Sequence, residues 1–126
     1  MRYKTLVRIF LGGGLGSMAR YGMARWISGL HLHHFPFGTL AVNVAACFIL
    51  GGLVGWGEHK QLVSADMRNF WTIGFCGGFS TFSTFSIEAL YLLQGGGTFS
   101  AFLYVALSII LCLAAVWAGI YLGQLL

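Results

Sequence analysis

The sequence predicts an all-α membrane protein that forms one domain over residues 1–126 and crosses the bilayer with four helices. The composition is the first reason: 58% of the 126 residues are hydrophobic and 8% are charged, whereas about a quarter of the residues in a soluble domain are charged. The second reason is the division of the chain into four apolar stretches, each close to the roughly 20 residues that a spanning helix needs. Open sheets leave unsatisfied edges in lipid, and the stretches lack the alternating pattern of barrel strands.

The first predicted span, residues 5–27, is the most polar because it carries Arg8, Arg20 and Arg25. Arg20 lies one or two turns from the end of the span, deeper than an interface anchor requires. Its guanidinium either snorkels to the headgroups or serves a function inside the membrane. No signal-peptide cleavage site follows the basic N-terminus, so we expect this stretch to remain in the mature protein.

The second span, residues 37–57, has no charge but contains Asn43, whose amide offers two donors and one acceptor. A hydrogen bond between helices and the lining of a pathway are both open interpretations of this residue. The fourth span, residues 99–125, is also uncharged. Its Tyr104, Ser108 and Cys112 are spaced by four and therefore share one helix face.

The third span, residues 70–93, contains the most informative segment of the chain. Residues 80–86 read STFSTFS and directly follow Gly77 and Gly78. Hydroxyl groups that bond back to carbonyls one turn earlier explain one or two of the five hydroxyls. Five in seven positions favour a helix that is broken near residues 77–83, because irregular backbone at this depth is tolerated only where it lines protein, water or an ion.

The polar residues inside the predicted spans are mostly hydrogen-bond donors, and donors solvate anions. The single intramembrane carboxylate, Glu88, has three open roles: proton coupling, hydrogen bonding to hydroxyls, or neutralisation of Arg20. Phe82 and Phe85 lie three residues apart, on one face of a helix. Their rings attract cations through the face and anions through the edge, so their orientation decides between the two. The residues by themselves indicate a small anion.

Glycine spacing predicts close packing between the helices. Gly12 and Gly16, Gly51 and Gly55, and the triplet at 115, 119 and 123 each follow the small-xxx-small pattern. Such spacing lets helix backbones approach each other where lipid supplies no hydrophobic drive to association.

Several function classes are disfavoured by the sequence. The net charge of +4 is scattered over span ends, which does not fit nucleic acid but fits lipid headgroups or an anionic substrate. We find no Ser-His-Asp set, phosphate loop or metal-ligand motif and expect no enzyme. The histidines near Pro36 favour a polar surface loop over a metal site, and the cysteines have no paired spacing.

Three segments carry a resemblance to a known family: GGLGSMARY at residues 13–21, GTLAVN at 38–43 and GFCGGFSTFSTFS at 74–86. With these motifs the chain resembles the Fluc (CrcB) family of bacterial fluoride channels over essentially its whole length. The resemblance implies passive, fluoride-selective conduction across the bacterial inner membrane, which gives fluoride resistance. It also implies an antiparallel, dual-topology homodimer with two pores along the interface.

The resemblance also implies roles for individual residues. Fluoride would meet the ring edges of Phe82 and Phe85 and a donor on Asn43, with Arg20 near the vestibule. The remaining polar residues of the pore would be Ser83, Thr84, Tyr104, Ser108 and Glu88. A structural sodium ion would bind backbone carbonyls of Gly77 and Ser80 from both subunits.

Two features depart from the family pattern, and one rival class is closer than a structural subunit without transport, which would not need the polar run at residues 80–86. Cys112 stands where members can carry serine, and the excess of basic residues on the N-terminal side exceeds that expected of a chain inserting equally both ways. The rival is a small dimeric multidrug exporter that exchanges protons for cationic drugs. Such exporters use a carboxylate in the first span, where this chain has arginine, which repels a cationic cargo.

Overall fold

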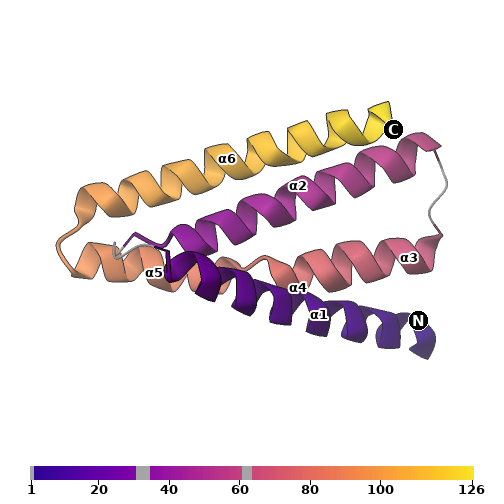
Figure 1. Ribbon diagram of the computed structural model, residues 1–126, viewed down its shortest axis with the longest axis horizontal. Coiled ribbons are helices and arrows are strands. Elements are labelled where there is room, and N and C mark those ends of the chain that lie inside the picture. Colours follow the sequence, from indigo (N-terminus) through magenta and orange to yellow (C-terminus); the bar gives the residue numbers. More distant parts are fainter. Residues whose placement is uncertain (1, 31–34, 61–63) are drawn as a thin grey trace.

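The computed structural model describes residues 2–30, 35–60 and 64–126, and the regular elements in these ranges are all helices (Figure 1). In chain order they are α1 (Tyr3–Ser28), α2 (Phe37–Lys60), α3 (Ala65–Asn69), the π-helix η1 (Phe70–Cys76), α4 (Gly77–Phe79), α5 (Phe82–Gln94) and α6 (Thr98–Leu125). The predicted all-α fold is therefore confirmed for this part of the chain. The three histidines at 31, 33 and 34 lie outside the described residues.

Two of these helices are long and apolar enough to cross a membrane by length and composition. They are α2, over Phe37–Gly57, and α6, over Thr98–Leu125, which match the second and fourth predicted spans. The first predicted span is the more polar helix α1, and the third is divided among α3, η1, α4 and α5. The apolar character of α2 and α6 supports a membrane protein.

The helices form two pairs, each held by direct backbone contact. In Figure 1, α1 runs beside the α3–η1–α4 segment, and α2 runs beside α6. A methyl group on Gly16 would overlap the carbonyl oxygen of Phe75, so α1 and η1 approach as closely as backbones allow. The same holds for α2 and α6, where a methyl group on Gly119 would overlap the Phe48 carbonyl. The predicted role of the glycines in close packing is confirmed.

The third stretch changes its hydrogen-bonding pattern twice. It begins at Ser64, whose hydroxyl caps α3 by accepting from the Met67 amide at 3.2 Å. The wider π-helical turns of η1 lead into the single turn α4, and such turns are frequent at functional sites. The backbone then becomes extended at Ser80 (φ −83°, ψ 159°) and Thr81 (φ −152°, ψ 118°) before α5 begins.

The ends of the molecule are fixed by local features. An ion pair between Arg8 and Asp66 joins α1 to α3. At the opposite end, α5 turns into α6 through three glycines, of which Gly96 has φ 85° and thus a conformation that favours glycine. Both chain termini lie at the same end of the bundle (Figure 1).

Candidate functional site

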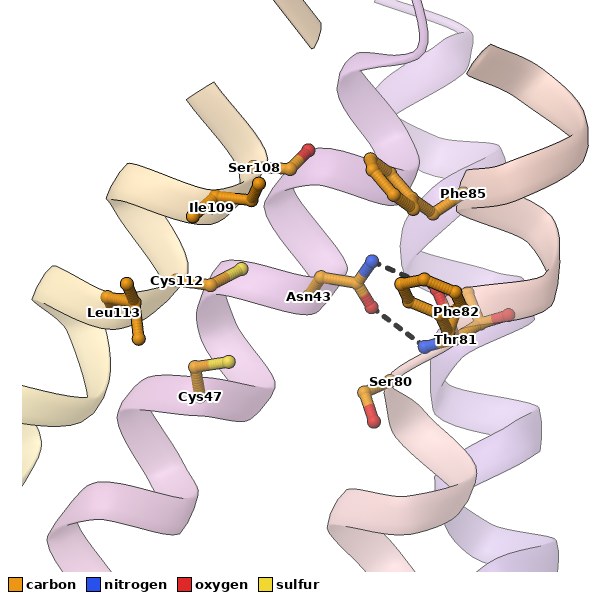
Figure 2. A pocket seen from close by; sticks show the side chains of 10 residues that line it. All are labelled: Asn43, Cys47, Ser80, Thr81, Phe82, Phe85, Ser108, Ile109, Cys112 and Leu113. Carbon is orange, nitrogen blue, oxygen red and sulfur yellow. Dashed lines mark hydrogen bonds between the residues drawn. The ribbon is translucent and has the colours of Figure 1, made fainter. Parts of the chain in front are cut away.

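The extended backbone at residues 80 and 81 is held by one side chain from α2. The Asn43 amide donates from Nδ2 to the Thr81 carbonyl oxygen at 3.0 Å, and its Oδ1 accepts from the Thr81 amide at 2.7 Å. Figure 2 shows both bonds side by side. Asn43 thus replaces the helix partners that Thr81 loses at the interruption, and the second N–H of Nδ2 is left for another acceptor. The two interpretations of Asn43 are combined here, since it bonds between helices and also lines a cavity.

Three of the five hydroxyls of the STFSTFS segment make local hydrogen bonds with the backbone. Ser80 and Ser86 donate to the carbonyls of Cys76 and Phe82, one turn earlier, at 2.8 and 2.9 Å. The Thr81 hydroxyl caps α5 by accepting from the Thr84 amide at 3.1 Å. Back-bonding therefore explains two of the five hydroxyls, and capping explains a third.

The interruption also frees carbonyl oxygens at the end of α4. Arg20 of α1 donates from Nε to the Gly78 carbonyl at 3.0 Å, so its guanidinium serves the broken segment instead of reaching only for the headgroups. Among the described residues, no hydrogen bond reaches the carbonyl oxygens of Gly77 and Ser80. Gly77 is exposed and Ser80 is partly buried in the single chain, so both carbonyls are open to a ligand, to water or to a second copy.

The extended segment forms one wall of a cavity of about 390 Å³ between α2, α5 and α6 (Figure 2). Its wall is mostly apolar and is interrupted by a few polar groups, an arrangement typical of sites for small ligands. Phe82 and Phe85 line it together, with ring centres 5.5 Å apart and planes inclined by 46°. The full lining comprises Asn43, Cys47, Ser80, Thr81, Phe82, Phe85, Ser108, Ile109, Cys112 and Leu113.

Two further cavities continue from the first. Thr81 lines the first cavity and also a second one of about 250 Å³, which contains Arg20, Thr84 and Glu88. Glu88 and Pro36 line both the second cavity and a third one of about 660 Å³ near the α5–α6 turn. Shared walls place the three cavities in series along α5.

Glu88, the carboxylate of the third predicted span, is engaged by a hydroxyl. Thr39 of α2, which is 7% exposed, donates to Glu88 Oε1 at 2.6 Å. Of the three roles open for Glu88, hydrogen bonding to a hydroxyl is the one seen in this geometry. Arg20 lines the same cavity, but its observed hydrogen bond goes to the Gly78 carbonyl.

Two buried hydroxyls on α6 have no hydrogen-bond partner within the described ranges. Tyr104 is fully buried and Ser108 is 7% exposed, yet neither the Oη of Tyr104 nor the Oγ of Ser108 makes a well-formed hydrogen bond there, although Tyr104 Oη lies beside Glu88 and Thr39. The Tyr104 ring packs against Phe85 with centres 5.1 Å apart. A buried hydroxyl without a partner is costly, and Ser108, which lines the first cavity, can offer its donor to a ligand or water there.

Most of the predicted site residues gather at the first two cavities, and some do not. Asn43, Phe82, Phe85 and Ser108 meet at the first cavity, and Arg20, Thr84 and Glu88 at the second. Tyr104 lies behind Phe85. Ser83 is exposed, with its hydroxyl 3.3 Å from that of Thr81, and lines none of the three cavities in series. Gly77 and Ser80 share a smaller cavity of about 140 Å³, which has Ser80 and Cys47 in common with the first cavity.

The sequence predictions missed three contributors to this site: Thr39, Thr81 and Cys47. A signal for two of them was present, because Thr39, Asn43 and Cys47 are spaced by four and form a stripe on one face of α2. The stripe mirrors the one formed by Tyr104, Ser108 and Cys112 on α6. The part played by the Thr81 backbone had no such signal.

Comparison with known proteins places the chain in a family. Residues 7–120 match the family described as "CrcB-like protein, Camphor Resistance (CrcB)". The chain belongs to the CrcB family. This confirms the resemblance inferred from the three sequence motifs.

Several relatives in the CrcB family carry the name "Fluoride-specific ion channel FluC". The protein of Geobacter sulfurreducens is 46% identical over 92% of this chain and 94% of its own length. That of Flavobacterium psychrophilum is 41% identical over 96% of this chain and 98% of its own. That of Hahella chejuensis is 41% identical over 100% of this chain and 99% of its own. These names describe ion channels and not enzymes.

Proposed function

We propose that this protein is a passive, fluoride-selective channel that lets fluoride leave the cell across the bacterial inner membrane. Two independent lines support the proposal. The relatives that cover nearly the whole chain are named as fluoride-specific channels. The three cavities, which share wall residues between the α5–α6 turn and the phenylalanine pair, supply this chain's part of a route.

The observation that carries the proposal is the excess of unused donors beside the phenylalanine rings. The hydroxyls of Tyr104 and Ser108 are buried without a partner in the described residues, and Asn43 keeps one free N–H. Fluoride is small and strongly hydrated, so several moderate donors have to replace its water without holding it too tightly. The edges of Phe82 and Phe85 add positive ring hydrogens at the same place.

The proposed assembly is an antiparallel homodimer with two pores and multiple spans per chain. A four-helix bundle of this size packs its own interior, so a continuous pore needs a second copy. Phe82 is 78% exposed although it borders the main cavity. A second copy covering this open side would bring the ring into a closed passage.

A structural sodium ion at the dimer interface belongs to the same proposal. The carbonyl oxygens of Gly77 and Ser80 fit such an ion, because neither accepts a hydrogen bond among the described residues and both border one cavity. Hard cations take oxygen ligands, and carbonyls freed at a broken helix coordinate sodium in membrane proteins. Two carbonyls from each of two copies would supply four ligands. The bound cation would hold the two interrupted segments together.

Fluoride efflux from liposomes tests the function directly. Purified protein is reconstituted into vesicles loaded with potassium fluoride, and external fluoride is recorded with an electrode after valinomycin is added. We expect rapid fluoride release and no comparable release from matched chloride-loaded vesicles. Fluoride flux that requires a proton gradient, or no fluoride flux at all, would refute the channel.

A further inference from the structure

Two thiols occupy equivalent places on the paired helices α2 and α6. The two helices run in the same direction, and a methyl group on Gly51 would overlap the carbonyl oxygen of Val116. Cys47 and Cys112 each lie four residues before that contact, which is about one helical turn. The closest approach of the two backbones therefore brings these cysteines opposite each other.

Both thiols also face the main cavity. Cys47 and Cys112 are free, half-buried and part of its lining. Figure 2 shows both sulfur atoms directed from their helices toward the space that holds Asn43 and the phenylalanine rings. The third cysteine, Cys76, is 4% exposed and does not border this cavity.

We propose that Cys47 and Cys112 form a two-coordinate binding site for a soft, thiophilic cation of the Cu⁺ class. Thiolates select such ions over hard cations. Cations of this class accept two sulfur ligands, so a pair suffices. This matters because the described residues contain no group of three or more metal-binding side chains. On binding, each S–H loses its proton to water and two sulfur–metal bonds form, with no change in oxidation state.

The occupied site would obstruct the anion route, an effect that rests on the proposed function. Two thiolates and one Cu⁺ carry a net charge of −1 beside Asn43 and Phe82. A fixed negative charge in a poorly solvated passage repels an approaching anion. The metal also fills space in a cavity of only about 390 Å³. Cys112 thus makes this chain sensitive to thiophilic metals in a way that serine at this position would not.

Mercury binding to the purified protein tests the site independently of transport. Hg²⁺ is the probe because it shares the two-coordinate sulfur chemistry and is stable in air. After a glutathione wash, native mass spectrometry is expected to show one mercury ion retained per wild-type chain. The mass of the protein should rise by that of mercury less two hydrogen atoms. Cys47→Ser and Cys112→Ser are each expected to lose it, and Cys76→Ser, the matched control, to keep it. Mercury retained in either single variant, or mercury lost in Cys76→Ser, would show that Cys47 and Cys112 do not bind the metal as a pair.

Flux measurements test the obstruction. Each variant is compared with its own fluoride efflux before mercury is added. Two thiolates with Hg²⁺ carry no net charge, so mercury tests obstruction by filled space alone. We expect wild-type efflux to fall at least tenfold with Hg²⁺ and to recover with dithiothreitol, while the Cys47→Ser/Cys112→Ser double variant responds less than twofold. Mercury that binds wild-type protein without slowing its efflux would overturn the obstruction. Absence of efflux before mercury would contradict the channel instead, and the binding measurement would still decide the metal site.

Discussion

Replacing Asn43 by aspartate exchanges the Nδ2 amino group for an oxygen. This substitution tests most directly the two hydrogen bonds between Asn43 and Thr81. Oδ1 continues to accept from the Thr81 amide, at 2.7 Å in the wild type. The donor to the Thr81 carbonyl, at 3.0 Å, becomes an oxygen. Leaving this acceptor without a donor costs about 1–3 kcal/mol of folding free energy. We therefore expect a lower unfolding temperature but a folded protein.

The effect on transport is expected to be larger because a carboxylate adds negative charge at the cavity. For an assumed separation of about 6 Å and an effective dielectric constant of about 20, one fixed negative charge raises the energy of an anion by roughly 3 kcal/mol. At about 1.4 kcal/mol per tenfold change, this predicts roughly 100-fold slower fluoride efflux.

The assay is fluoride-electrode recording of liposome efflux, with dimer content followed on a sizing column. Asn69→Asp is the matched control: it is the same chemical change at the end of α3, where the asparagine side chain makes no capping hydrogen bond. We expect near-normal efflux from this control. Wild-type efflux in Asn43→Asp would refute the reasoning, and equal losses in both variants would assign the effect to net charge alone.

Four further outcomes are expected. Phe82→Ile removes a ring that is 78% exposed, so efflux should fall at least tenfold with dimers intact on the sizing column, whereas monomers alone would indicate a packing role. Tyr104→Phe deletes a hydroxyl without a partner in the described residues, so the unfolding temperature should hold while efflux drops, and unchanged efflux would contradict its role in the path. Long dialysis against sodium-free buffer should abolish efflux, and indifference to sodium would remove the proposed ion. Gly119→Ala places a methyl group against the Phe48 carbonyl and should destabilise the protein by about 1–3 kcal/mol in thermal unfolding, while Gly14→Ala, with open space around it, should not.

The helices could be predicted closely because apolar runs and turn residues mark their ends. The predicted second span, residues 37–57, starts at the first residue of α2, and the predicted fourth span, 99–125, starts one residue after α6 begins. The π-helical turns of η1 could not be predicted. They depend on how this segment packs against Gly12 and Gly16 of α1, and nothing in the local sequence specifies that register.

The candidate site could be predicted only in part from the sequence, for a similar reason. Residue type indicated that Asn43 and Glu88 matter, but their partners depend on how far each helix is rotated. Thr39 became the partner of Glu88 through packing across 49 residues of chain. Thr81 contributes through its backbone, which a side-chain pattern cannot reveal. Ser83 shares the composition of its neighbours, yet its place on α5 leaves it exposed.

The glycine contacts have a mechanical consequence. Because backbone lies directly on backbone within each pair, α1 with η1 and α2 with α6 have little freedom to slide. Each pair therefore moves as one rigid unit. The α2–α6 pair is joined to the chain that follows η1 by hydrogen bonds between Asn43 and Thr81 and between Thr39 and Glu88. We therefore expect small hinge motions of the chain to occur between the two helix pairs. Loss of either contact would change the spacing between the pairs without unfolding them.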